Sequence, residues 1–91
     1  MDQLTMIDKA LEIVAQYKKE RVHPFNLETS LHYRRAGDYG DHIVITMLAD
    51  GFVYSTRTFS TTRLQNTKMG MKEFLFLELD RMADEIEKEY K

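Results

Sequence analysis

The sequence predicts an α+β domain with the order α-β-β-β-α, in which both helices pack on one face of a three-stranded antiparallel meander. Apolar residues recur every three to four positions near both ends of the chain, which is typical of amphipathic helices. In the middle of the chain the apolar period falls to two, which is typical of strands. The pair Asp50-Gly51 between two strand-like segments predicts a hairpin, so the strands that it joins are antiparallel.

The first helix is expected to run from residue 4 to about residue 21, with Asp2 or Thr5 capping its start. Its apolar stripe consists of Leu4, Ile7, Leu11, Val14 and Tyr17, with Ala10 and Val22 on or near it. The helix ends before His23-Pro24, because a residue that precedes proline avoids helical dihedral angles and the proline ring clashes with the preceding turn.

Three strands are expected at residues 27–34, 42–49 and 52–60. The first alternates apolar and polar residues, so one of its faces is solvated, whereas the second is apolar on both sides. Glycines and aspartates in residues 36–41 predict the loop between these two strands. The third strand follows the Asp50-Gly51 turn directly and completes the meander.

The hairpin turn predicts the register of the sheet. A two-residue turn at Asp50-Gly51 pairs Ala49 with Phe52. In this register, the residues of the third strand that face the helices are Phe52, Tyr54, Thr56 and Thr58. On the other side of the second strand, Ile43 pairs with Tyr33, because a slip by one residue would bury the charged side chains of the first strand.

Residues 61–66 are expected to form a connector, followed by Thr67 as a helix cap and by a last helix over residues 71–89. The apolar stripe of this helix consists of Leu75, Leu79, Met82, Ile86 and Tyr90. Residues 74–77 are apolar nearly all round, which predicts that this end is deeply buried or lies in a second interface. Because no repeat or linker interrupts the pattern, residues 1–91 are expected to form a single domain.

The predicted register gathers basic and aromatic residues on the uncovered face of the sheet. Arginine binds phosphate or carboxylate through forked hydrogen bonds, imidazole gains charge on mild acidification, and phenylalanine stacks a base or anchors a partner side chain. A second subunit or the arginine stems could also simply cover this face. The candidate binding residues are His32, Arg34, His42, Arg57 and Phe59, with Tyr39, Arg63 and Lys68 as further candidates.

A net charge of -2 provides no overall attraction to nucleic acid. The charge is nevertheless uneven, because residues 51–72 contain no acidic residue whereas the last helix is acidic. The bases of the acid-free segment are Arg57, Arg63, Lys68 and Lys72. The preference of strands for serine and threonine over glutamate, together with a solvated helix face, would produce the same pattern.

Several chemistries lack their sequence signals. The absence of cysteine excludes disulfides, thiolate metal sites and cysteine nucleophiles. His32 and His42 have no third ligand at a recognisable spacing, so no metal or cofactor is expected. No serine motif, paired-carboxylate motif or glycine-rich phosphate loop is present, which argues against an enzyme. No signal-peptide or membrane-spanning pattern is visible, so we expect a cytoplasmic location.

The order helix, meander, helix resembles that of the double-stranded RNA-binding domain, a family that reads A-form RNA by shape. In that family the second helix begins with a lysine-rich phosphate clamp. The matching segment here, residues 66–72, contains Lys68 and Lys72 and precedes an acidic helix. The resemblance therefore concerns topology, and no functional residue is carried over from it.

The sequence thus predicts a small non-enzymatic binding or regulatory module that acts through protein contact on the uncovered sheet face. That contact would be self-association in a homodimer or inhibition of a partner protein. The alternative is nucleic-acid contact along the acid-free residues 51–72. A third hypothesis is small-anion binding by the same arginines.

Overall fold

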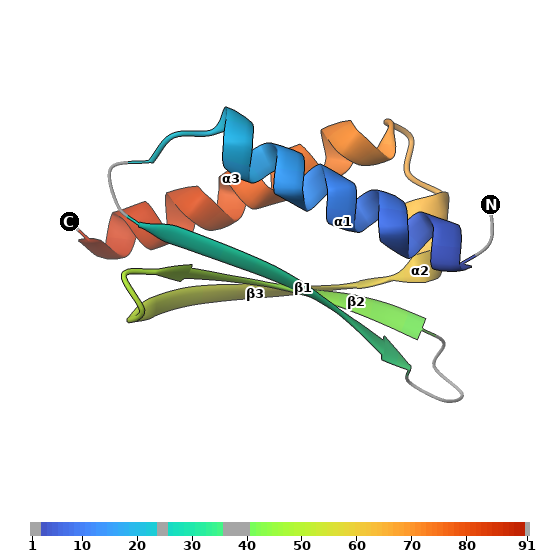
Figure 1. The fold of residues 1–91 in the computed structure, drawn as a ribbon, viewed down its shortest axis with the longest axis horizontal. Helices are drawn as coiled ribbons and strands as arrows, with labels where there is room; N and C mark the ends of the chain where they lie inside the picture. The colour runs from blue at the N-terminus through green and yellow to red at the C-terminus, as the bar shows by residue number, and fades with distance from the viewer. Residues whose placement is uncertain (1–2, 24–25, 36–40, 91) are drawn as a thin grey trace.

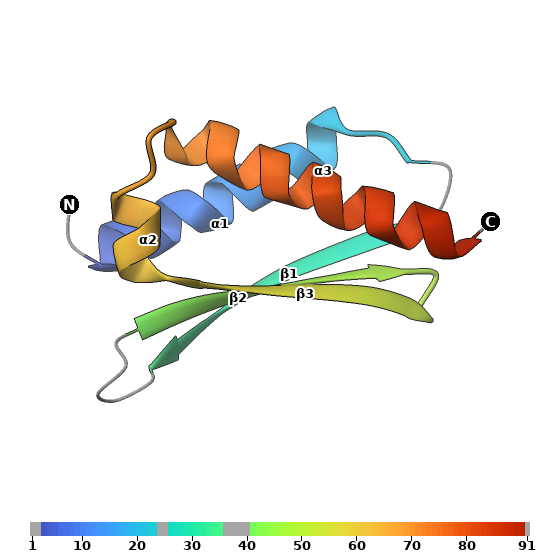
Figure 2. The same cartoon turned by 180° about the vertical axis from the view of Figure 1, so that it is seen from behind.

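The computed structural model describes residues 3–23, 26–35 and 41–90 of the chain, and it confirms the predicted α+β fold. The sheet has the order β1-β2-β3 and is antiparallel throughout, and the helices cover one of its faces (Figures 1 and 2). The predicted loop residues 36–40 and Tyr39 among them lie outside the described residues. The elements are α1 (Gln3–Glu20), β1 (Leu27–Arg35), β2 (Asp41–Ala49), β3 (Val53–Ser60), α2 (Thr61–Gln65) and α3 (Met71–Tyr90).

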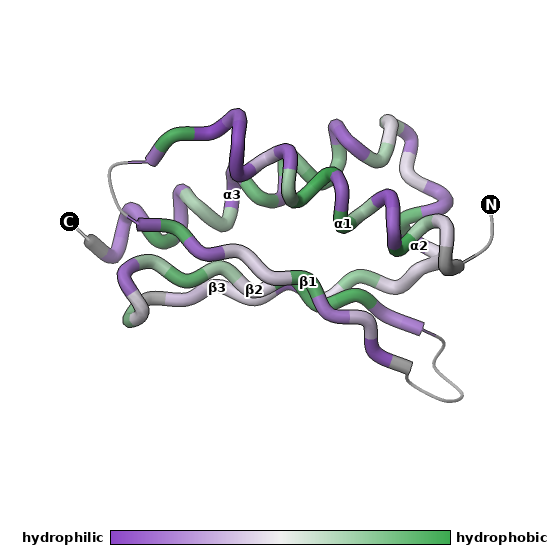
Figure 3. The backbone as a smooth tube through the Cα atoms, in the orientation of Figure 1, coloured by the Kyte–Doolittle hydropathy of each residue, from purple (hydrophilic) through white to green (hydrophobic). Residues whose placement is uncertain are grey.

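The core lies between the sheet and the two long helices, where α1 packs on β1 and α3 packs on β3 and on α1. Hydrophobic and hydrophilic residues alternate along both helices, as expected for helices with one buried face (Figure 3). Fully buried side chains come from α1, from the helix-facing side of β2 and from α3. The largest of them are Tyr17, Met6, Ile43, Ile45, Met47, Leu75, Leu79, Met82 and Ile86.

The buried arc of α1 differs from the predicted stripe. Met6 and Ile13 are buried, whereas Leu11 is 44% exposed. The helix is flanked by both β1 and α3, so its buried arc is centred on the line from Met6 to Tyr17 and passes Leu11 on one side. Val22 is 93% exposed, because it follows the end of the helix.

The register between β1 and β2 is confirmed, with Tyr33 opposite Ile43. The predicted register between β2 and β3 is wrong by one residue, because Ala49 pairs with Val53 and not with Phe52. Both Asp50 and Gly51 have positive φ angles, of 52° and 78°, as a hairpin turn of this kind requires. The Phe52 amide donates to the Ala49 carbonyl at 3.1 Å, but Phe52 stays outside the ladder.

This shift reverses the faces of β3, because side chains alternate along a strand. Ser55 and Phe59 are buried against the helices, while Phe52 is 86% and Tyr54 is 69% exposed. Phe59 packs edge-on against Phe74 of α3, with ring centroids 5.4 Å apart. The shifted register therefore buries Phe59 against α3 and leaves Phe52 and Tyr54 exposed.

The expected connector is partly helical. Ser60 caps the short helix α2 by accepting a hydrogen bond from the Arg63 amide at 3.1 Å, and Leu64 anchors the helix in the core. Thr67 does not cap α3, because its hydroxyl donates to the Met69 carbonyl at 2.6 Å instead.

The last helix follows the prediction closely. Its predicted stripe is buried from Leu75 to Ile86, and the side chain of Tyr90 lies outside the described ones. In the apolar run 74–77 the first two residues are buried, whereas Leu77 is 38% exposed. Among the described residues, neither long helix is apolar enough to cross a membrane.

Candidate functional site

The face of the sheet opposite the helices is the first candidate site. No helix or strand of the described residues covers it (Figures 1 and 2). We call this surface the open face. Its residues alternate with those of the core face and form four cross-strand rows: Glu28, Leu48 and Tyr54; Ser30, Thr46 and Thr56; His32, Val44 and Thr58; Arg34, His42 and Ser60.

The open face has different chemistry at its two ends. The row that includes Glu28 is acidic on β1 and apolar or aromatic at Leu48 and Tyr54. The row at the other end is basic, with Arg34 directly opposite His42. The two rows between them carry hydroxyl side chains, His32 and a half-buried Val44.

Three predicted site residues are together, as the sequence indicated. Arg34 and His42 are cross-strand neighbours, and His32 lies on the same face two positions along β1. None of the three side chains makes a hydrogen bond or ion pair with a described residue. Arg34 and His32 are exposed, so their donors are available to a partner.

Two other predicted site residues, Phe59 and Arg57, do not lie on the open face, and the prediction is wrong for both. Phe59 is only 5% exposed and belongs to the core. Arg57 faces α3, where its guanidinium donates to Glu85, and the Ser55 hydroxyl donates to the same carboxylate at 3.1 Å. Both corrections have one cause, the one-residue shift between β2 and β3.

The remaining described candidates, Arg63 and Lys68, do not belong to the sheet. Arg63 belongs to α2 and Lys68 to the connector before α3, and both line a hollow of about 290 Å³. The bases of the acid-free segment therefore do not share one surface. Arg57 is paired with Glu85 between β3 and α3, whereas Arg63 and Lys68 line the hollow.

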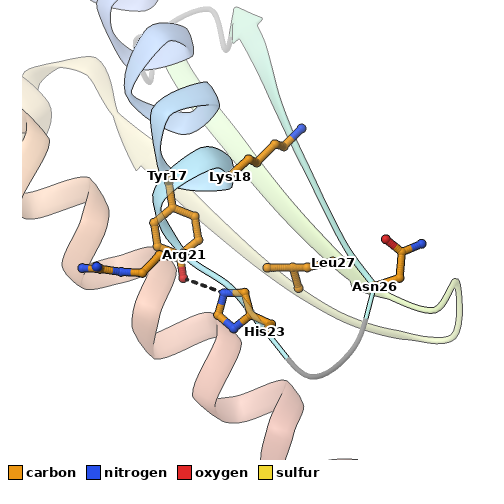
Figure 4. A pocket seen from close by; sticks show the side chains of 6 residues that line it. All are labelled: Tyr17, Lys18, Arg21, His23, Asn26 and Leu27. Carbon is orange, nitrogen blue, oxygen red and sulfur yellow. Dashed lines mark hydrogen bonds between the residues drawn. The ribbon is translucent and has the colours of Figure 1, made fainter.

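A polar cluster that sequence reasoning did not find joins α1 to α3. The Tyr17 hydroxyl donates to Asp80 Oδ1 at 3.0 Å, and Arg21 donates to both oxygens of the same carboxylate at 3.2 and 3.4 Å. His23 Nε2 lies 3.4 Å from the Tyr17 hydroxyl, as Figure 4 shows. Tyr17 and Asp80 are 63 positions apart, so no local pattern could reveal their contact.

The cluster connects α1 to α3 through hydrogen bonds to one carboxylate. The pKa of Tyr17 is raised above its usual range. Burial is the largest cause, and the hydrogen bond to Asp80 is the second. The raised pKa keeps the hydroxyl protonated at neutral pH, so it donates its hydrogen bond to Asp80. Beside it lies a small hollow of about 160 Å³, which includes Lys18 and Asn26 in its lining (Figure 4).

The described part of the chain contains no group of three histidine, cysteine, aspartate or glutamate side chains that could hold a metal ion. His32 and His42 lie in neighbouring rows of the open face without a third such ligand among the described residues. Comparison of the chain with models of known families, with curated proteins and with solved structures found no match.

Proposed function

We propose that this chain is a non-enzymatic protein-interaction module whose open face binds a second copy of the chain. The observation that supports the proposal is the separation of charge along β1. Glu28 lies near one end of this strand and Arg34 near the other, on the same uncovered face. Such a surface is complementary to itself after a two-fold rotation.

The two-fold rotation that brings opposite charges together has its axis midway between the two sheets, parallel to them and perpendicular to the strands. It reverses the strand direction, so Glu28 of one copy lies over Arg34 of the other, and the same contact occurs twice. Face-to-face sheets pack about 10 Å apart, which is within reach of these long side chains. Glu28 borders a hollow of about 280 Å³ whose lining includes Ser30 and Thr46 of the sheet and Lys18 of α1.

Apolar burial would supply most of the affinity. Tyr54 is 69% exposed, Leu48 and Val44 are half-buried, and an aromatic side chain brings a large contact area at low entropic cost. Exposed ion pairs contribute about 0–1 kcal/mol each, so the two Glu28–Arg34 pairs would mainly select the orientation. A single three-stranded face is a small interface, and we expect a reversible dimer.

Charge exchange tests the proposal. Glu28→Arg and Arg34→Glu each place like charges opposite one another, and each should weaken dimerisation by about tenfold or more at low salt. The double variant restores both pairs with reversed sign, so it should dimerise about as well as the original chain. Sedimentation equilibrium over a range of protein concentrations measures all four dimerisation constants.

Glu12→Arg provides a matched control, because it makes the same charge change on an exposed position of α1. It should leave the dimerisation constant unchanged, and circular dichroism should show the same helix content in every variant. A chain that stays monomeric at all concentrations contradicts the proposal. So does a double variant that dimerises no better than the single ones.

A further inference from the structure

Two hollows flank the connector between α2 and α3. One has a volume of about 440 Å³ and the other about 290 Å³, and they share Thr67 and Met69. This connector lies at the end of the long axis where α1 begins, whereas the turn between β2 and β3 lies at the opposite end (Figures 1 and 2). None of the residues that line the two hollows belongs to a strand, so the hollows are separate from the open face.

Neither hollow has a carboxylate in its lining. Lys9 lines the larger one, and Arg63 and Lys68 line the smaller one. Most of their lining residues belong to the acid-free residues 51–72. A concave surface that is lined by one sign of charge raises the local concentration of ions of the opposite sign.

Arg63 is positioned without being neutralised. Its guanidinium carbon lies 5.8 Å from the ring centroid of Phe59 and 5.6 Å from that of Phe74. Its guanidinium makes no hydrogen bond or ion pair with a described residue. By contrast, Arg21 and Arg57 each bind a carboxylate of α3. The forked donors of Arg63 are thus held in place and unused.

The rest of the smaller hollow is suited to an organic group. Phe74 and Met69 contribute apolar surface, and Asn66 contributes an amide that can donate hydrogen bonds. Methionine adapts its shape to different ligands. Ligand sites commonly combine such apolar walls with a few polar groups that orient the ligand.

We propose that the smaller hollow binds an organic phosphate. The phosphate accepts hydrogen bonds from Arg63 and Lys68, and the organic part lies against Met69 and Phe74. Asn66 donates to the phosphate or to a polar group of the organic part. The same chemical unit occurs in a free nucleotide and in single-stranded nucleic acid, and the two sources can be separated by experiment.

The test is a titration of the full chain, followed by NMR, with adenosine monophosphate, adenosine and inorganic phosphate. We expect adenosine monophosphate to shift the Arg63 Nε–H and Asn66 amide resonances, to bind more tightly than phosphate, and to lose affinity as salt is added. Adenosine should cause no such shifts. A short oligothymidylate that binds more tightly than adenosine monophosphate would identify a strand as the source, and weaker binding would identify a free nucleotide.

Arg63→Ala should weaken adenosine monophosphate by about tenfold or more. Arg81→Ala on α3, which removes an exposed arginine paired with Glu78, should leave its affinity unchanged. Should Arg63→Ala unfold the chain by loss of its ring contacts, the exposed Lys68→Ala variant makes the same comparison. The absence of shifts with adenosine monophosphate overturns the proposal, as do shifts that persist unchanged in the folded Arg63 or Lys68 variant.

Discussion

Replacement of Phe59 by alanine is expected to lower the free energy of unfolding by about 3–5 kcal/mol. The side chain is 5% exposed and packs edge-on against Phe74, so its removal leaves a cavity between β3 and α3. Domains of this size are stabilised by about 5–15 kcal/mol in total. The variant should therefore be close to unfolding at room temperature, and urea titration followed by circular dichroism measures the change.

Phe52→Ala is the matched control, because Phe52 is 86% exposed at the hairpin turn. It should change the free energy of unfolding by no more than about 0.5 kcal/mol. In the register that the sequence predicts, Phe52 would face the helices and Phe59 would lie on the open face. A larger loss for Phe52→Ala than for Phe59→Ala would contradict the observed register and restore Phe59 to the open face.

Tyr17→Phe is expected to lower stability at neutral pH and to change how stability depends on alkaline pH. The hydroxyl donates to a charged carboxylate from a fully buried side chain, and a hydrogen bond of this kind contributes about 1.5–3 kcal/mol. Asp80 keeps its contact with Arg21 in the variant, so the loss should fall toward the lower end of this range.

The alkaline effect follows from the raised pKa of Tyr17 in the folded chain. Above about pH 10 the unfolded tyrosine loses its proton while the folded one retains it, so the unfolded state binds fewer protons. Stability then falls as pH rises, by up to about 1.4 kcal/mol per pH unit from this group. Urea titrations between pH 9 and about pH 11 should show this slope reduced in Tyr17→Phe.

Tyr54→Phe controls for the chemistry of the substitution, because Tyr54 is mostly exposed on the open face. It should keep the full alkaline slope. If Tyr17→Phe has the same slope as the original chain, then burial and the hydrogen bond to Asp80 do not raise the pKa of Tyr17 in the folded chain.

The strand registers show why the candidate site could be predicted only in part. On β1, a slip by one residue would bury Arg34 and His32, and this large penalty made the pairing with β2 predictable. On β3 the penalty is small, because each face carries one large aromatic residue, Phe59 on one and Tyr54 on the other. The charge on the Phe59 face, that of Arg57, is paired with Glu85 of α3. The pairing of Arg34 with His42 was therefore predictable, whereas the positions of Arg57 and Phe59 were not.

The amino-acid pattern alone determined the order of the elements, the helix-sheet layering and the pairing of β1 with β2, because periodicity acts over a few neighbouring residues. Three features depended on contacts between distant segments: the facing of β3, the Tyr17–Asp80 link, and the placement of Arg63 over two aromatic rings. Their free energies come from partners on α3, and no local pattern records which partner a side chain meets. On the open face and in the hollow beside Arg63, this tertiary arrangement leaves Arg34 and Arg63 without a carboxylate partner among the described residues.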